Sequence, residues 1–185
     1  MSLLLAFAPF IGFAAIGATI GATWGLLAGA LIAAAMLVHG ARRSRGRLKV
    51  LEVGTFLLFG GLALIAAIGG AAWSIAGVRL CVDLGLLIIV LVSIAIRRPF
   101  TLQYAREETP PDLWQRPEFI RANYLITAVW AAAFLVMTLA DVVMVYLPGV
   151  PHYVGIVATL VAIVAAVRFT LWYPRRARAR VSAPS

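Results

Sequence analysis

Four ionisable side chains interrupt stretches that are otherwise long runs of apolar residues, and they are Arg79, Asp83, Asp141 and Arg168. A charge in hydrocarbon costs on the order of 2.5–3.5 kcal/mol, so such residues face the interior of a helix bundle and pair there. Arg79 and Asp83 are four positions apart, which places both on one face of a helix. Arg79 and Asp141 lie at similar depths in their runs, so we expect these three residues to cluster. Arg168 lies near the other end of its own apolar run, where a long side chain can extend to the membrane interface.

This cluster supports two interpretations. The first is a polar site or a proton-linked relay for a transported solute or a lipid headgroup, because ionisable groups inside a membrane often mark such paths. The second is a structural clamp, in which the acids and arginines only neutralise one another. Residue types and spacing leave both interpretations open.

The sequence contains no pattern that is typical of an enzyme or a metal site. No nucleophile elbow, zinc-protease helix or phosphate-binding glycine loop occurs in a fitting context. Cys81 is the only cysteine, which excludes an intrachain disulfide and a cysteine metal cluster. His39 and His152 lie beside different apolar runs, at what we expect to be opposite faces of the membrane. We therefore predict a protein without catalytic residues, bound metal or cofactor.

The elements that must position these charges are membrane spans. The chain of 185 residues is 63% hydrophobic and only 12% charged, whereas soluble domains are roughly 45–50% apolar. Runs of about 20 apolar residues fit a bilayer crossing. Such runs are found near residues 22–39, 52–69, 73–96, 120–146 and 153–173.

The first apolar block is too long for one crossing. Residues 1–39 carry no charge and would form a helix of about 58 Å at 1.5 Å per residue. We expect a short separate segment over residues 2–16, spanning or re-entrant, with Pro9 breaking or kinking it; one long tilted helix is the alternative. The predicted fold is thus an all-α membrane protein, with five or six transmembrane helices in a single domain over residues 1–174.

Basic residues gather in segments that we expect on one side of the membrane. These segments are residues 42–49, the loop 97–121 and the tail 175–185, whereas the connections 69–72 and 147–152 hold no arginine or lysine. Positive residues resist translocation, so we predict a multi-pass protein of the bacterial inner membrane with its C-terminus in the cytoplasm. The net charge of +9 then indicates contact with anionic lipids at the cytoplasmic face, and not nucleic acid binding, which needs a folded soluble basic surface.

Glycines recur every fourth residue within the first apolar block, at Gly17, Gly21, Gly25 and Gly29. On one helix they would form a face with almost no side-chain bulk, and such a face lets another helix approach closely. We expect this ridge to pack within the chain, with a homo-oligomer as the alternative.

The longest polar stretch, residues 97–119, is expected to be an interfacial loop in the cytoplasm. Pro110 and Pro111 should break any helix between its two parts, and its acids nearly balance its arginines. Mixed charge can pair with a protein partner or with lipid phosphates, although a loop whose charges satisfy one another is the alternative. The candidate contact residues are Arg97, Arg98, Tyr104, Arg106, Glu107, Glu108, Asp112, Trp114 and Arg116.

The order of several short features resembles a known family. These features are Pro9 in an apolar N-terminus, the basic run Arg42 to Lys49, Thr55 and Phe56 with Phe59 and Gly60, the Arg97, Arg98, Pro99 run, Asp112 with Trp114 and Arg116, and Trp130 with Phe134. Together they resemble the intracellular septation protein A family of small bacterial inner-membrane proteins. The resemblance implies a non-enzymatic role in the cell envelope, in septation or membrane organisation with envelope or division proteins as partners. A small oligomeric transporter or channel that uses the Arg/Asp cluster is the alternative.

Overall fold

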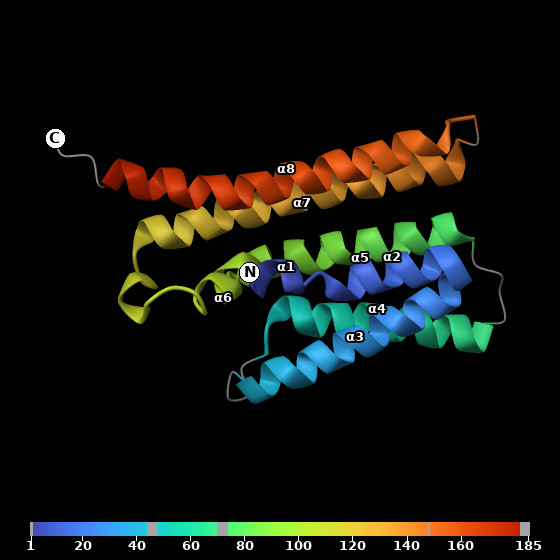
Figure 1. Cartoon of the computed structure of the whole chain (residues 1–185), viewed down its shortest axis with the longest axis horizontal. Coiled ribbons are helices and arrows are strands. Elements are labelled where there is room, and N and C mark those ends of the chain that lie inside the picture. Colours follow the sequence, from blue (N-terminus) through green and yellow to red (C-terminus); the bar gives the residue numbers. More distant parts are fainter. Residues whose placement is uncertain (1, 44–47, 70–73, 148, 182–185) are drawn as a thin grey trace.

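The computed structural model describes residues 2–43, 48–69, 74–147 and 149–181, and these residues form helices joined by short connections (Figure 1). Six stretches are long and apolar enough to cross a membrane. No strand occurs in the described part of the chain. The predicted all-α fold is therefore confirmed, and the chain has the features of a multi-pass membrane protein.

The first apolar block folds as a helical hairpin. Helix α1 (Ser2–Leu5) leads into α2 (Ala8–Ile20), and α3 (Ala22–Arg43) follows after a single residue. Pro9 lies in the first turn of α2, where its missing N–H costs no helical hydrogen bond. A separate first segment is thus present, as expected, and not one long helix. Its helix continues past the expected end at residue 16 to Ile20, and the stretch Leu3–Ile20 is long enough to cross a bilayer.

Gly21 forms the turn of this hairpin. Its φ of +117° lies in a region that side chains with a Cβ rarely adopt, so glycine is required at this position. The four periodic glycines therefore do not form one ridge on one helix, as we had expected, because the helix breaks in the middle of the pattern.

Three of the four glycines are used for close packing within the chain. A Cβ on Gly25 would lie 2.8 Å from the carbonyl oxygen of Phe13 and 2.9 Å from the Cα of Gly17, so α2 and α3 touch backbone to backbone. A Cβ on Gly29 would lie 2.6 Å from the ring of Phe59 on α4 (Val50–Gly69). Small residues allow this approach in a membrane, where helix contact depends on van der Waals packing.

The remaining elements follow in chain order as α5 (Ile75–Ala95), α6 (Phe100–Ala105), the 3-10 turn η1 (Pro111–Leu113), α7 (Pro117–Tyr146) and α8 (His152–Val181). Helix α8 extends beyond the expected span 153–173 and contains Pro174, so residues 175–181 of the expected tail continue the helix. Residues 182–185 lie outside the part that the structure describes.

Helix α5 ends in a motif that normally uses glycine. The N–H of Arg98 donates to the carbonyl of Ser93, and the N–H of Arg97 donates to that of Ile94, both at 2.9 Å. These are the two hydrogen bonds of a Schellman cap. Arg97 occupies the left-handed position of this cap, with a φ of 57°, and so stores backbone strain.

The helices pack in a sequential order, α2 on α3, α3 on α4, α4 on α5, α5 on α7 and α7 on α8. Helix α8 lies beside α7 at one edge of the bundle, α3 lies at the opposite edge, and α2 lies near α5 between them (Figure 1). One apolar core surrounds Trp130 and Phe134 of α7, and a second surrounds Phe59 of α4 with Leu26 of α3.

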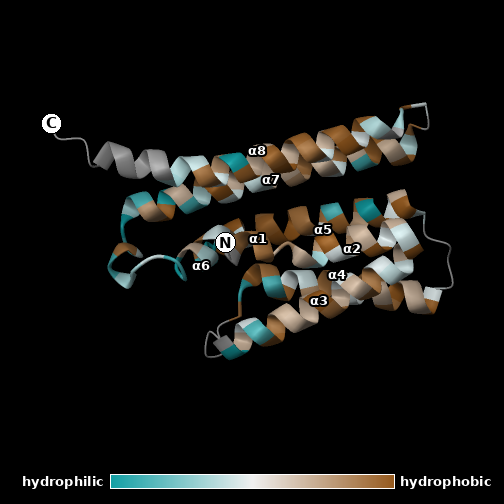
Figure 2. Ribbon diagram, viewed as in Figure 1, coloured by the Kyte–Doolittle hydropathy of each residue, from teal (hydrophilic) through white to brown (hydrophobic). Residues whose placement is uncertain are grey.

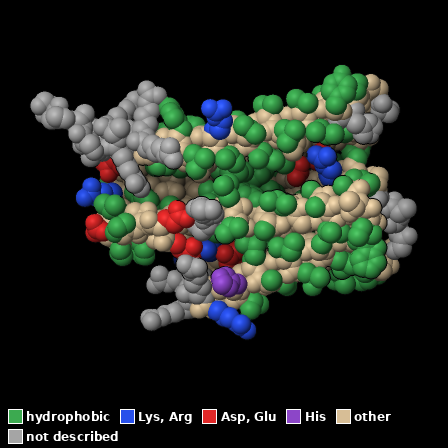
Figure 3. Space-filling view, in the orientation of Figure 1, with side chains coloured by type: hydrophobic (Ala, Val, Ile, Leu, Met, Phe, Trp, Pro, Cys, Tyr) green, Lys and Arg blue, Asp and Glu red, His purple; other side chains and the backbone are tan. Residues whose placement is uncertain are grey.

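The outer surface is as apolar as the core. Leucine and isoleucine side chains of the long helices point outward, among them Leu31, Leu64, Ile68 and Leu139, and hydrophobic residues dominate the middle of the helices (Figure 2). Acidic and basic side chains gather at the end of the molecule that carries α6 (Figure 3). Such a surface is solvated by hydrocarbon and not by water.

Candidate functional site

The predicted charge cluster joins three helices. Arg79 of α5 pairs with Asp141 of α7, with 3.6 Å between Nη2 and Oδ1. The same Nη2 donates a hydrogen bond of 3.4 Å to the Thr159 hydroxyl of α8. Asp83 lies one turn further along α5, where its carboxyl is next to that of Asp141. The structure thus brings Arg79, Asp83 and Asp141 together at the interface of α5 and α7, where the spacing placed them.

The cluster is buried on its acidic side and open on its basic side. Asp83 and Asp141 are only 8% and 4% exposed, whereas the side chain of Arg79 is 36% exposed. Oδ2 of Asp141 has no hydrogen-bond donor among the described residues. Asp141 forms the ion pair with Arg79, and Asp83, which lines the groove, can accept a hydrogen bond from a further donor.

Arg168 does not belong to the cluster. It lies on α8 and is exposed, nine residues beyond Thr159, which corresponds to about 13 Å along a helix. The sequence groups it with the other three only as a charge within the spans, and its exposed position on α8 agrees with the expectation that it lies apart from them. Thr159 takes part in the cluster instead; it was missed although it is a polar residue in the apolar run of α8.

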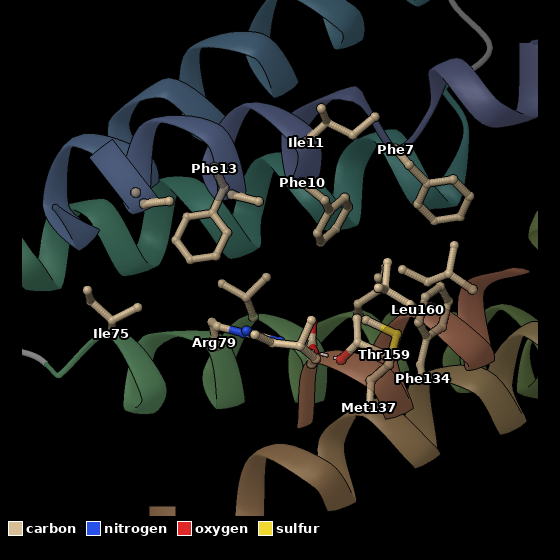
Figure 4. Close-up of a pocket in the computed structure, with 18 of the residues that line it drawn as sticks. Phe7, Phe10, Ile11, Phe13, Ile75, Arg79, Phe134, Met137, Thr159 and Leu160 are labelled. Carbon is tan, nitrogen blue, oxygen red and sulfur yellow. Dashed lines mark hydrogen bonds between the residues drawn. The ribbon is translucent and has the colours of Figure 1, made fainter. Parts of the chain in front are cut away.

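An apolar groove begins at this cluster. Helices α2 and α8 form its walls, α5 and α7 form its floor, and its cavity volume is about 540 Å³, within the 300–1,000 Å³ that is typical of small-molecule sites. Phe10 and Phe13 of α2 face Phe134 and Met137 of α7 across it (Figure 4). Arg79 and Asp83 supply its charged lining.

The groove opens sideways toward the surroundings of the bundle. Its rim residues Ile11, Ile75 and Leu160 are exposed, although they are large and apolar. Its charged end lies close to the start of α5, because Arg79 is in the first turns of that helix. The other end reaches Phe7, which stacks on Trp130 with 4.7 Å between ring centroids. A long apolar ligand would thus lie along the helices, with its polar end at Arg79.

The expected cytoplasmic contact loop is only partly available as a surface. Most of α6 is buried, and Tyr104 is 3% exposed. Lys49 pairs with Glu52 at 3.2 Å and with Glu107 at 2.8 Å, and its Nζ lies 4.2 Å from the centre of the Tyr104 ring. Tyr104 is therefore a packing residue, and its expected role as a contact residue was wrong.

Burial also affects the chemistry of Tyr104. Its pKa is raised far above the ordinary value, first by desolvation and then by the negative charges of Glu52 and Glu107. The hydroxyl is therefore neutral at any physiological pH.

Hydrogen bonds anchor α6 to the helices around it. The Gln103 side chain accepts from the N–H of Val50 and donates to the carbonyl of Arg98, both at 2.9 Å. The Thr101 hydroxyl donates to the carbonyl of Asn123 at 2.8 Å and lies 2.7 Å from the Thr127 hydroxyl. Short connections to α4 and α7 thus fix the position of α6.

The rest of the loop remains a mixed-charge surface. Arg106 stacks over Trp114, with 5.7 Å between the guanidinium carbon and the ring centre, and the Trp114 indole donates to the carbonyl of Thr109 at 2.9 Å. The exposed candidate contact residues are Arg97, Arg98, Glu107, Glu108, Asp112 and Arg116. These residues, without Tyr104, form the surface that a partner could contact.

Comparison with known proteins gives no match to any family model, curated protein or solved structure. Among the described residues no group of three acids, histidines or cysteines could hold a metal ion. The groove and its charged end are therefore the features from which a function can be inferred.

Proposed function

We propose that this protein binds a membrane amphiphile in the groove between α2 and α8, and that it acts as a non-enzymatic component of the bacterial inner membrane in the organisation of the cell envelope. The observation that carries the proposal is a groove that is open to hydrocarbon along its length and ends in a charged cluster. Its two kinds of lining match the two parts of an amphiphile, an acyl or prenyl chain and a polar headgroup.

The apolar part of the groove accommodates a chain but does not select it. Lipid tails are about as apolar as the side chains that line the groove, so moving a tail from the bilayer into the groove brings no hydrophobic gain. Affinity must come from the contacts that the headgroup makes with Arg79, Asp83 and Thr159. Charges in a low-dielectric site give such contacts more strength than they have in water.

Two neighbouring alanines on α2 provide the test. Ala14 lines the groove, whereas Ala15 is exposed and does not line it. We expect Ala14→Trp to fill the groove and remove co-purifying lipid from the protein, as measured by native mass spectrometry from detergent, while Ala15→Trp keeps it. Equal lipid retention by both variants would contradict the proposal.

A second candidate is transport, and the adjacent carboxyl groups of Asp83 and Asp141 inside the bundle favour it. Such pairs form proton relays in membrane carriers. If the protein is a transporter, proteoliposomes that contain the wild-type protein should show a flux of solute or protons, and Asp83→Asn should abolish that flux. Flux that is unchanged by the substitution, with equal protein incorporation, would exclude the cluster as the path.

A role in septation or membrane organisation would use the exposed loop surface. Its arginines and acids are on the end that carries α6, which we predict to face the cytoplasm. We expect recovery of envelope or division proteins in a pull-down to depend on Asp112 and Arg116, which are exposed, and not on Tyr104, which is buried. Loss of recovery with Tyr104→Phe and retention with Asp112→Arg would contradict this assignment.

A further inference from the structure

We infer that the groove selects a zwitterionic phospholipid with a primary amine, of the phosphatidylethanolamine class, over anionic and choline lipids. This inference rests on the proposed function, because it concerns the headgroup of the amphiphile in the same groove. It follows from the charges at the end of the groove and from the exposure of each of them.

Arg79 is the group that can hold a phosphate. More than a third of its side chain is exposed, and it lines the groove. One of its terminal nitrogens is engaged with Asp141 and Thr159, while a guanidinium has five N–H donors in all. Donors thus remain for a phosphate oxygen, which is an anion that arginine binds well.

Asp83 is the group that can hold an amine. It lines the groove one turn from Arg79, and its carboxyl lies beside that of Asp141. A primary ammonium has three N–H donors, and the Asp83 carboxyl is the acidic group that it would meet in the groove. A phosphate on Arg79 therefore places an ethanolamine ammonium one helical turn away, next to the Asp83 carboxyl.

The balance of charges separates the lipid classes. Arg79 already pairs with Asp141, and Asp83 lies one turn away in the groove. Phosphatidylglycerol brings no positive group for the Asp83 carboxyl, whereas the zwitterion places an ammonium beside it. Phosphatidylcholine has the same net charge as the ethanolamine lipid but has no N–H to donate. Choline should therefore bind more weakly, because hydrogen bonds to the acids are lost.

The test uses three lipids with identical acyl chains, in equimolar amounts in detergent, and native mass spectrometry of the full-length protein. We expect the wild type to retain phosphatidylethanolamine about tenfold better than phosphatidylcholine, as expected for the loss of a hydrogen bond to a charged group, and also better than phosphatidylglycerol. Stepwise N-methylation of the ethanolamine lipid should weaken binding at each step, and this series needs no variant protein. Asp83→Asn should reduce the preference, whereas Glu118→Gln, an exposed acid at the start of α7, should keep it.

The outcomes distinguish the two proposals. If the three lipids bind equally and Ala14→Trp displaces all of them, the groove holds lipid but the headgroup inference is wrong. If Ala14→Trp displaces none, the proposed function itself fails. If Ala14→Trp instead converts a dimer to a monomer, the groove is occupied by a second copy of the chain, which overturns both.

Discussion

The backbone contact between α2 and α3 allows a sharp prediction, because the two glycines that make it are not equivalent. A Cβ on Gly25 would meet backbone atoms at 2.8 and 2.9 Å, whereas a Cβ on Gly17 would meet only the Phe13 ring at 3.8 Å and the Cα of Gly25 at 3.9 Å. Ordinary carbon contacts are about 3.5–4.0 Å. We therefore expect Gly25→Ala to destabilise the protein and Gly17→Ala to be tolerated.

The size of the effect follows from these distances. At Gly25 the new methyl group is too close by about 0.6–1 Å, and backbone atoms cannot rotate away, so the two helices must separate. Overpacking of this kind costs about 1–3 kcal/mol. Alanine also favours a helix over glycine by up to about 1 kcal/mol, but this gain occurs in both variants and cancels in the comparison. Gly25→Ala should thus be about 1–3 kcal/mol less stable than Gly17→Ala.

Unfolding in mixed micelles of mild detergent and dodecyl sulfate, followed by circular dichroism, measures this difference. Gly60→Ala is the control, because a Cβ on Gly60 of α4 has no atom within 4 Å, and its stability should equal or exceed that of the wild type. Equal unfolding midpoints for Gly25→Ala and Gly17→Ala would refute the close approach of α2 and α3.

Three further predictions concern the end that carries α6. Arg97→Gly should stabilise the protein by about 1 kcal/mol, because it relieves the left-handed strain of the α5 cap; a lower unfolding midpoint would contradict the cap. Thr101→Val should cost about 1–3 kcal/mol by removing the hydrogen bonds to Asn123 and Thr127, and more than Thr138→Val, whose hydroxyl bonds only within its own helix. The pKa of Tyr104 is raised in the folded protein, so the folded state favours the neutral hydroxyl. The stability that this residue contributes is therefore present below about pH 10, its pKa in the unfolded chain. It is lost as the pH rises above that value, because the hydroxyl then ionises in the unfolded chain. Alkaline destabilisation should accordingly be smaller in Tyr104→Phe, and a Tyr104 that ionises near its ordinary pKa in the folded protein would contradict its burial.

Much of this protein could be predicted from local sequence. Long runs without charge require helices in hydrocarbon, so the all-α fold and the existence of the spans follow from hydropathy alone. The pairing of Arg79 with Asp141 was also predictable, since charges at similar depth in two spans are costly unless they meet.

Other features depend on which helices become neighbours, and local sequence does not contain that information. Gly21 fits a helical repeat of glycines, and only the hairpin shows that it is the turn. Tyr104 looks like a surface residue of a polar loop, until α6 packs against α4 and α7 and buries it. The groove is formed by α2 and α8, which are separated by more than 130 residues at Ile20 and His152.

Local sequence predicts the spans but not the groove, because hydropathy acts residue by residue whereas packing acts between pairs of helices. Hydropathy acts on every residue separately, because the free energy of placing an apolar side chain in lipid hardly depends on its partners in the chain. A charge in a span must find a partner, and so few charges lie in the spans that the partners can be inferred from depth. Close packing, burial of a polar group and the shape of a cavity depend on pairs of surfaces, and in a bilayer these surfaces are selected by fit and not by hydrophobicity. Sequence therefore determined that the chain enters the membrane and which charges must pair there, whereas the tertiary structure decided where a ligand could lie.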